Sequence, residues 1–462
     1  MVEKLRKTLR DSKAARWTAL AVVAFTMLCG YFLTDVLSPL QTMLEEQNGW
    51  DASDFGTFMG SYGWFNVFLL MLIFGGIILD KWGVRITGLG ATSLMVIGTA
   101  IKYWAVSTTF GDGAVIFGLK TQVFFACIGY AIFAVGVEVA GITVSKIIVK
   151  WFKGKELALA MGMEMATARL GTLLAMAITP FFAKHFQSVS LPILLCLILL
   201  CVGLIAFIVY CVMDKKLDKE DEAIGELEAK PADEDKFKLS DIGLILGNKG
   251  FWLIALLCVL FYSAVFPFLK FAAGLMINKF GIKEELAGLI PSVLPLGTLF
   301  LTPFFGNLYD RRGKGASIMI LGAALLIAVH AILALPFVTN WVLALVLIII
   351  LGIAFSLVPS AMWPSVPKII PERQLGTAYS LIFWIQNWGL MGVPMLIGWV
   401  LQKYCIVGQT MGESGTMRTV YDYTLPMVIF AVLGVLALVV AFMLKAEDKK
   451  KGYGLELPNI QP

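Results

Sequence analysis

The sequence contains only two histidines, and charged residues make up just 15% of it. None of its seven cysteines forms a C-x-x-C pair, and six of them lie within apolar runs. This pattern argues against a disulfide framework or a cysteine-rich metal site. We also find no nucleophile elbow, Walker loop or H-E-x-x-H pattern, so we expect neither an enzyme nor a bound cofactor or metal.

Apolar residues are abundant instead. The sequence is 59% hydrophobic, and its mean hydropathy is +0.83. Soluble domains contain roughly 45–50% apolar and about 25% charged residues. Runs long enough to cross a bilayer recur along the whole chain. The composition therefore predicts an all-α polytopic membrane protein.

We expect twelve transmembrane helices, arranged as two bundles of six. The expected spans are 17–40, 55–79, 84–108, 119–150, 156–183, 189–213, 250–279, 286–309, 315–337, 341–366, 374–402 and 422–445. Segment 214–248 is rich in mixed charges, which predicts a solvated linker with at most a short surface helix. The chain would then consist of an N-terminal bundle (1–213), this linker, and a C-terminal bundle with a tail (249–462).

The distribution of Lys and Arg predicts the orientation, because cytoplasmic loops carry an excess of them. Basic residues crowd the first sixteen positions and the turns at 80–85, 150–155 and 311–314. The turn at 41–54 on the opposite side has four acidic residues and no Lys or Arg. We therefore expect both termini and the 214–248 linker in the cytoplasm.

The two halves repeat a motif. Residues 76–85 read G-x-x-x-D-K-x-G-x-R after the second span, and residues 306–314 read G-x-x-x-D-R-x-G-K after the eighth. A second echo links KELALA at 155–160 to RQLGTA at 373–378. Parallel repeats of this kind are typical of transporters that hold their substrate between the halves, near the midplane.

Two ionisable residues lie at the centre of neighbouring expected spans. Glu138 precedes Lys150 by twelve residues, and Arg169 follows Glu156 by thirteen. At ~1.5 Å rise per residue, both lie roughly 18–20 Å from the same membrane face. A charge in hydrocarbon is costly and is normally retained for a pathway or a partner. Opposite charges at one depth suit a zwitterionic substrate, although a purely structural Glu–Arg pair is the alternative.

Other candidates for a substrate site are polar or aromatic side chains in apolar runs. They are Tyr62, Trp64, Trp363, Gln386 and Asn387. Such residues suit a wet cavity, and hydrogen bonding between helices is the alternative. The pattern alone leaves both open.

Two further charges are candidates for substrate binding. Asp35 in the first span would attract a cationic group or titrate, or else cap its helix. Lys270 in the seventh span would contact an anionic group, or else snorkel to the surface. Three other lysines lie nearer span ends and are expected to snorkel: Lys102, Lys146 and Lys184.

The repeated motif resembles the signature loop of the major facilitator superfamily, and it occurs at the matching turn of each half. The resemblance implies that Asp80 latches onto the start of the eleventh span and Asp310 onto the start of the fifth, stabilising the outward-open state. Helix N-termini attract such carboxylates. The implied gating residues are Asp80, Arg85, Asp310, Arg311 and Arg373.

A more specific resemblance is to the major facilitator superfamily domain-containing 1 group, the lysosomal dipeptide uniporters. It rests on WFKGKEL (151–157), ARLG (168–171), AVFPF (264–268), KFG (279–281), PERQLGTAY (371–379) and IQN (385–387). It implies a carrier that moves dipeptides down their gradient. Glu138 would hold the amino end of the dipeptide and Arg169 the carboxyl end.

The sequence leaves competing functions open. An organic-anion or dicarboxylate exchanger would use Arg169 and Lys270 as its clamp, but Glu138 would repel the substrate. A proton-coupled small-molecule transporter is the other alternative. We expect a monomer in a bacterial inner membrane, with a lysosomal membrane as the alternative, a small-molecule substrate and the lipid bilayer as partners, and no nucleic acid.

Overall fold

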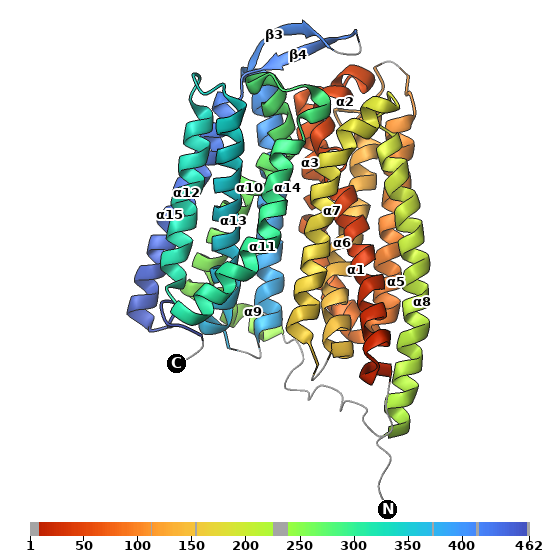
Figure 1. Ribbon diagram of the computed structural model, residues 1–462, viewed down its shortest axis with the longest axis vertical. Coiled ribbons are helices and arrows are strands. Elements are labelled where there is room, and N and C mark those ends of the chain that lie inside the picture. The colour runs from red at the N-terminus through yellow and green to blue at the C-terminus, as the bar shows by residue number, and fades with distance from the viewer. Residues whose placement is uncertain are drawn as a thin grey trace, which may run out of the picture.

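The computed structural model describes residues 9–111, 113–152, 155–224, 239–371, 374–412 and 415–459. Two helical bundles stand side by side with their helices roughly parallel (Figure 1). We call α1–α8 the N-terminal half and α9–α15 the C-terminal half. The described chain starts and ends at the same end of the bundles, here named the terminal face. The opposite end carries the β3–β4 hairpin and is named the hairpin face.

The N-terminal half contains most of the short elements. Its elements are η1 (Leu9–Asp11), α1 (Lys13–Asp35), η2 (Ser38–Leu40), α2 (Gln41–Asn48), α3 (Ala52–Gly60), η3 (Ser61–Gly63), α4 (Trp64–Phe68), α5 (Met71–Ser107), β1 (Val115–Ile116), β2 (Leu119–Lys120), α6 (Thr121–Phe152), α7 (Leu157–His185) and α8 (Leu191–Ile224).

The C-terminal half is more regular. Its elements are α9 (Leu239–Leu246), α10 (Lys249–Phe280), η5 (Glu284–Leu286), α11 (Leu289–Arg312), α12 (Gly315–Ala334), α13 (Trp341–Ile369), α14 (Leu375–Tyr404), β3 (Ile406–Met411), β4 (Met417–Tyr421) and α15 (Thr424–Lys451). Strands β3 and β4 pair antiparallel, with Gln409 opposite Thr419.

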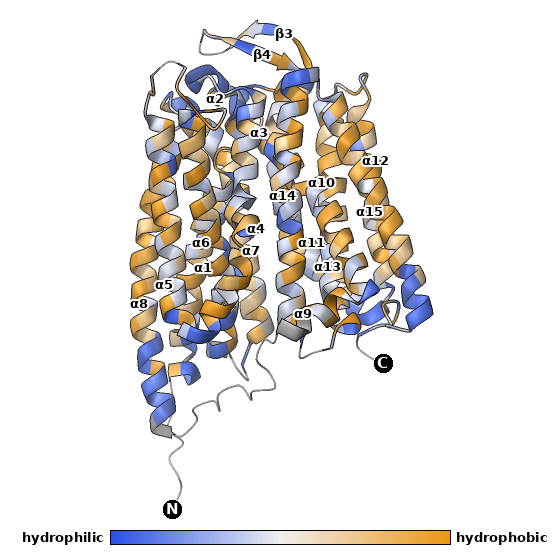
Figure 2. Ribbon diagram, turned by 180° about the vertical axis from the view of Figure 1, so that it is seen from behind, coloured by the Kyte–Doolittle hydropathy of each residue, from blue (hydrophilic) through white to orange (hydrophobic). Residues whose placement is uncertain are grey.

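Local sequence signals account for many helix ends. Asn248 and Asn340 begin α10 and α13, and each side chain accepts hydrogen bonds from backbone N–H groups of the first turn. Glycines in the left-handed conformation end α2, α10 and α15. Hydrophobic residues predominate along the helices of both bundles, and hydrophilic residues gather at the two faces (Figure 2). This is the surface that a bilayer requires.

The second expected span is not one continuous helix. It is divided into α3, η3, α4 and the start of α5, with Leu70 in the left-handed region at φ 52°. Helix α5 then runs through Gly83 at φ 75°, where the second and third expected spans meet. In the described residues eleven helices are long and apolar enough to cross a membrane. We take α3 to the Gly83 break as the second crossing, which retains the expected twelve.

The expected boundary of the charged linker is wrong at its start. Helix α8 continues through Ile224, and Asp214 is fully buried although it was expected in a solvated segment. The short helix α9 lies in the second part of the segment, as expected. The division of the chain into domains at this linker stays a prediction.

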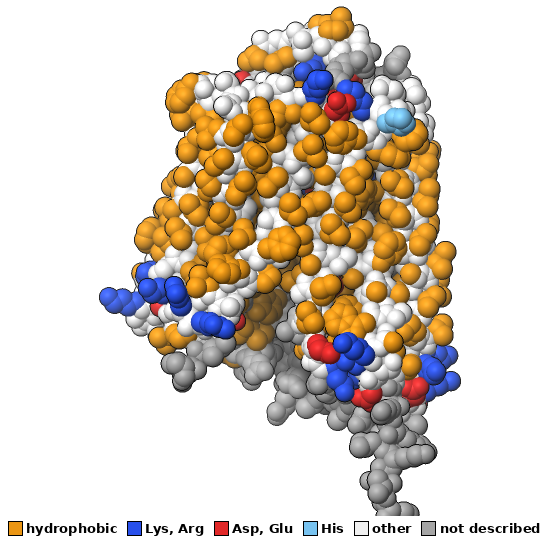
Figure 3. Space-filling model, viewed as in Figure 1, with side chains coloured by type: hydrophobic (Ala, Val, Ile, Leu, Met, Phe, Trp, Pro, Cys, Tyr) orange, Lys and Arg blue, Asp and Glu red, His pale blue; other side chains and the backbone are white. Residues whose placement is uncertain are grey.

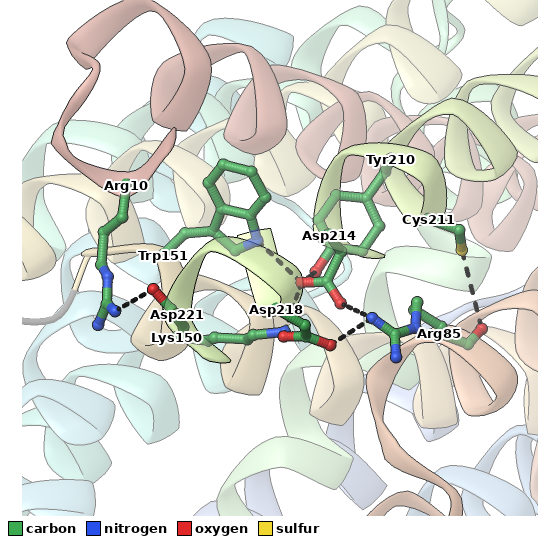
Figure 4. Close-up of polar contacts among 9 residues, drawn as sticks. All are labelled: Arg10, Arg85, Lys150, Trp151, Tyr210, Cys211, Asp214, Asp218 and Asp221. Carbon is green, nitrogen blue, oxygen red and sulfur yellow. Dashed lines mark hydrogen bonds and ion pairs between the residues drawn. The ribbon is translucent and has the colours of Figure 1, made fainter. Parts of the chain in front are cut away.

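Asp214 is buried because it joins three helices at the terminal face (Figure 4). Its carboxylate pairs with Arg85 Nη1 on α5 at 3.0 Å and with Lys150 Nζ on α6 at 2.7 Å. It also accepts hydrogen bonds from Trp151 Nε1 and Tyr210 Oη. Both carboxylate oxygens are therefore satisfied, which offsets the cost of burying the charge.

The halves touch closely toward the hairpin face, where glycines remove side chains from the seam. A Cβ added to Gly56 on α3 would lie 2.5 Å from Pro394 O and 2.7 Å from Gly398 Cα on α14. A Cβ on Gly288 would overlap Met176 O on α7. Backbones of α3 and α14, and of α7 and the start of α11, are thus in direct contact. At the terminal face the surface is hollowed between the halves (Figure 3).

We predict that Asp214→Asn lowers the free energy of unfolding by about 3–5 kcal/mol, because two cations lose their buried anion. The matched control is Asp218→Asn, since Asp218 pairs with the same Arg85 and Lys150 but is one-third exposed. Thermal unfolding of the purified protein measures both. Equal losses for the two variants would contradict the assignment of Asp214 as the central anion.

The glycine seam gives a second prediction. Gly398→Ala should force α3 and α14 apart and cost ~1–3 kcal/mol, because the seam has no room for a methyl group. Gly392→Ala on the same helix is the control, because nothing lies within 4 Å of its added Cβ. Its expected effect is neutral, or a gain of up to about 1 kcal/mol from helix propensity. The melting temperatures of the two variants should shift in opposite directions or by clearly different amounts.

Candidate functional site

Glu138 lies midway along α6 and faces the broken second crossing. Its Oε1 accepts a hydrogen bond from Tyr62 Oη at 2.7 Å. Tyr62 belongs to η3, so the 3-10 turn in this crossing presents the hydroxyl to the carboxylate. Both side chains are half-buried. The carboxylate keeps further acceptor positions, because an ionised carboxylate offers about four lone-pair sites.

Arg169 lies midway along α7 and its guanidinium reaches the C-terminal half. Its central carbon lies 5.8 Å from the ring centre of Phe266 on α10 and 5.6 Å from that of Phe355 on α13. The described residues provide no ion pair or hydrogen bond to this guanidinium. Glu164 on the same helix interacts with it electrostatically but lies too far for an ion pair.

The expected alternative of a closed Glu138–Arg169 pair is therefore wrong for this conformation. Tyr31 on α1 lies within electrostatic range of both residues and of Glu164. It comes this near because Gly171 on α7 lets α1 approach closely. Glu138 is thus hydrogen-bonded to a tyrosine, whereas Arg169 contacts two aromatic rings, and Tyr31 lies near both charges.

Aromatic residues of the C-terminal half pack around the two rings that Arg169 contacts. Trp363 Nε1 donates a hydrogen bond to Tyr262 Oη at 3.0 Å, and the Trp363 ring stacks on Phe383 at 4.9 Å. The Tyr262 ring in turn contacts Phe355 edge-on. Sequence reasoning found Trp363 but missed Tyr262 and Phe355, because aromatic residues are common in apolar spans and nothing local marks them.

The two expected amides of the eleventh span are buried, and their role in a substrate site stays a prediction. Gln386 and Asn387 on α14 are both buried. Asn387 Nδ2 donates to the backbone carbonyl of Phe383, one turn earlier, and its Oδ1 has no partner among the described residues. Trp64, by contrast, is half-buried at the start of α4. Of the five polar and aromatic candidates, Tyr62 and Trp363 are the ones whose side chains contact the residues around the two central charges.

Asp35 and Lys270 pair with each other across the seam. Lys270 Nζ lies 2.6 Å from Asp35 Oδ1 and also donates to Thr34 O at 2.9 Å. Their side chains are nearly buried. Lys270 thus does not snorkel. The pair joins α1 to α10 in the part of the seam that is closed, so it is placed to hold the hairpin face shut.

The hairpin face has further links between the halves. Thr419 N on β4 donates to Glu45 Oε1 on α2, and Tyr423 Oη donates to Gln41 Oε1. Lys184 at the end of α7 pairs with Glu285 of η5. These contacts and the Asp35–Lys270 pair all lie in the hairpin-side half of the molecule.

Three of the five expected gating residues have partners within their own halves. Asp80 is 75% exposed and pairs with Lys146 on α6, and Arg85 joins the Asp214 cluster. Asp310 accepts a hydrogen bond from Asn459 in the C-terminal tail. Arg311 is exposed, and Arg373 lies outside the described residues. In this conformation neither aspartate contacts the other half.

The C-terminal tail covers the second copy of the signature loop. Lys314 N and Gly315 N donate to the carbonyls of Glu456 and Leu455, each at 2.9 Å. Glu456 also accepts from Ser317 N. No described residue makes equivalent backbone hydrogen bonds to the first copy of the loop, so the described parts of the two halves differ here despite their shared motif.

One ion pair at the terminal face connects α1 to the turn before α7. Arg16 Nη2 lies 2.9 Å from Glu156 Oε2. A backbone hydrogen bond at Glu156, together with the Arg16 side chain, lowers the pKa of this carboxyl below its ordinary value. The pair therefore stabilises the fold at neutral pH, and its contribution is lost as the pH falls through that lowered pKa.

Comparisons with known proteins agree with this architecture. The family model described as Major Facilitator Superfamily matches residues 20–394 and, separately, 270–457. The lysosomal dipeptide transporter MFSD1 of Danio rerio is 28% identical over 400 residues, which covers 84% of this chain and 80% of that protein. The Homo sapiens protein of the same name is 28% identical over 404 residues, covering 84% and 81%.

Solved structures share the fold at low sequence identity. The nucleoside transporter NupG superposes with a TM-score of 0.68 at 16% identity, over 94% of this chain and 99% of that one. A D-xylose–proton symporter gives a TM-score of 0.67 at 14% identity, over 93% and 97%. The family match and the eleven long apolar helices of the described residues lead to one assignment. This chain belongs to the Major Facilitator Superfamily: it is an integral membrane secondary transporter of a small-molecule substrate, not an enzyme.

Proposed function

We propose that this transporter carries dipeptides, holding the amino end of the substrate at Glu138 and the carboxyl end at Arg169. The main support is the state of Arg169, a half-buried guanidinium that contacts two rings and pairs with no carboxylate of the described residues. The planar fork of donors in a guanidinium matches the geometry of a carboxylate, which is the group at the carboxyl end of a dipeptide. The likeness to MFSD1 proteins, which are named dipeptide transporters, supports the same substrate.

The surroundings of the two charges favour a zwitterion over a simple anion. Glu138 lies on the neighbouring helix, and its single described hydrogen bond comes from Tyr62. An incoming ammonium group would find free acceptor positions there. The wall formed by Tyr262, Phe355 and Trp363 would contact the side chains of the dipeptide.

We further propose that transport proceeds by rocking of the two halves about this site, as uniport. The hairpin face is closed by the glycine seam and by Asp35–Lys270, while the terminal face is hollowed (Figure 3). Rocking would open the first and close the second. The excess of Lys and Arg near the terminal face supports placing that face, and so both termini, in the cytoplasm, and we propose a monomer in a bacterial inner membrane.

A counterflow experiment tests the substrate. Proteoliposomes without a pH gradient should accumulate a labelled lysine-containing dipeptide, and Arg169→Ala should reduce uptake about 10- to 100-fold. This range corresponds to the loss of a charged hydrogen bond worth ~1.5–3 kcal/mol. Arg169→Lys should retain part of the activity, because it keeps the charge without the planar fork. Arg312→Ala, at an exposed position at the end of α11, is the control and should transport normally.

The variant Glu138→Gln distinguishes the dipeptide hypothesis from the organic-anion hypothesis. It should weaken dipeptide uptake, since the ammonium group loses its counter-charge. If the dipeptide is not taken up, and dicarboxylates are taken up better by Glu138→Gln than by the unmodified protein, the transporter is an organic-anion exchanger. Uptake that needs an imposed pH gradient would instead contradict uniport.

The signature loops give a further prediction. We propose that Asp80 latches onto the start of α14 when the terminal face closes, because its carboxylate is 75% exposed and bound only by the exposed Lys146 in the present conformation. Asp80→Asn should lower the transport rate by favouring the terminal-open state. Asp310→Asn should do so less, since Asp310 is already bound to Asn459. Counterflow rates of the two variants test this, and equal losses would contradict the proposed asymmetry.

A further inference from the structure

Lys102, near the hairpin-side end of α5, is buried instead of snorkelling as its sequence position suggested. Only 1% of Lys102 is exposed to solvent. Its Nζ lies over two aromatic rings, 4.5 Å from the ring centre of Tyr130 and 5.1 Å from that of Phe58. The described residues offer this ammonium no ion pair and no hydrogen bond. It is therefore a buried lysine whose amino group lies over two ring faces and has no described anion or hydrogen-bond acceptor.

Ring faces alone are weak compensation for such a charge. Cation–π attraction is modest, whereas an ammonium group without a counter-ion in apolar surroundings is strongly disfavoured. Intramembrane charges of this kind usually have a functional partner. The groups within electrostatic range of Lys102 are the Cys196 thiol on α8, Lys270 on α10 and Asp35 on α1. Asp35 is the sole carboxylate among these.

Tyr130 connects Lys102 to the ion pair that closes the hairpin face. Its ring carries the Lys102 ammonium, and its hydroxyl donates to Thr34 O at 2.7 Å, next to Asp35. The same Thr34 carbonyl accepts a hydrogen bond from Lys270. Tyr130 thus contacts Lys102 through its ring and, through its hydroxyl, the Thr34 carbonyl that Lys270 also binds. Asp35 pairs with Lys270 and lies within electrostatic range of Lys102.

The three charges are divided unequally between the halves. Asp35 and Lys102 lie in the N-terminal half, and Lys270 lies in the C-terminal half. If the halves separate at the hairpin face, Lys270 leaves with α10, and Asp35 would remain as an unpaired anion. Lys102 stays in the same half as Asp35. Its amino group lies over the ring of Tyr130, whose hydroxyl binds the carbonyl of Thr34 beside Asp35.

We propose that Lys102 is the alternative counter-ion of Asp35, so that Asp35 pairs with Lys270 when the hairpin face is closed and with Lys102 when it is open. Lys102 would leave the faces of Tyr130 and Phe58 to do so. Exchange of one partner for another keeps the aspartate compensated in both states and removes an electrostatic barrier to opening. This inference rests on the proposed rocking of the halves and not on the identity of the substrate.

A spectroscopic distance measurement tests it without substrate. Spin labels replace Phe117 in the N-terminal half and Met411 in the C-terminal half, both exposed at the hairpin face, in a background whose native cysteines are removed. Pulsed electron resonance in lipid nanodiscs then gives the fraction of molecules with an open hairpin face. Lys102→Met should lower that fraction about 5-fold or more, and Lys102→Arg should not.

The decisive comparison is a double-variant cycle. In the Asp35→Asn background the side chain carries no charge and needs no counter-ion when the hairpin face opens. Lys102→Met should therefore have no further effect on the open fraction. An unchanged open fraction for Lys102→Met alone, or an equal drop in both backgrounds, would overturn the proposal and leave Lys102 a structural cation. Lys102→Gln provides a second neutral variant if the methionine variant cannot be purified. Because these distances need no substrate, a failed dipeptide assay leaves this test intact.

Discussion

The cost of a charge among apolar helices governs this structure, and the partner of each buried charge indicates its role. Asp214 has four partners from three helices and is a structural anchor. Asp35 and Lys270 have each other across the seam, which ties their compensation to the conformation. Arg169 contacts aromatic faces and has no ion pair among the described residues, which is why we propose that a substrate carboxylate pairs with it. The same physical rule thus separates the anchoring charge from the charges to which we assign proposed gating and binding roles.

The two ends of the seam are held by different kinds of contact. Toward the hairpin face, backbones meet at Gly56, Gly398 and Gly288, and close packing there depends on the absence of side chains. At the terminal face charged residues of the loops form ion pairs within their own halves, as Asp80 does with Lys146. Because these ion pairs do not cross between the halves, the halves can separate at this end without breaking them. The conformation is accordingly closed at the hairpin face and hollowed at the other.

The two halves repeat a motif but do not use it in the same way. Arg85 in the first copy binds the buried Asp214 of its own half, and Asp80 stays exposed. In the second copy the tail bonds to Lys314 and Gly315 and to Asp310 itself. A repeated sequence therefore gives similar turns, while the segments packed against those turns decide which carboxylate remains available.

The sequence by itself determined the membrane-spanning class and the repeated motif of the two halves, and it predicted a shared depth for Glu138 and Arg169. These follow from local properties: the length of apolar runs, the spacing of a motif and the fixed rise of a helix. Only the tertiary structure decided which charges pair. Asp35 meets Lys270 across 235 positions of sequence, Asp214 is buried by helices distant in the chain, and Lys102 lies under Tyr130 instead of at the surface. The physical reason is that the energy of a buried charge depends on its partners. Helix packing brings those partners together from distant parts of the sequence, and local sequence patterns do not predict that packing.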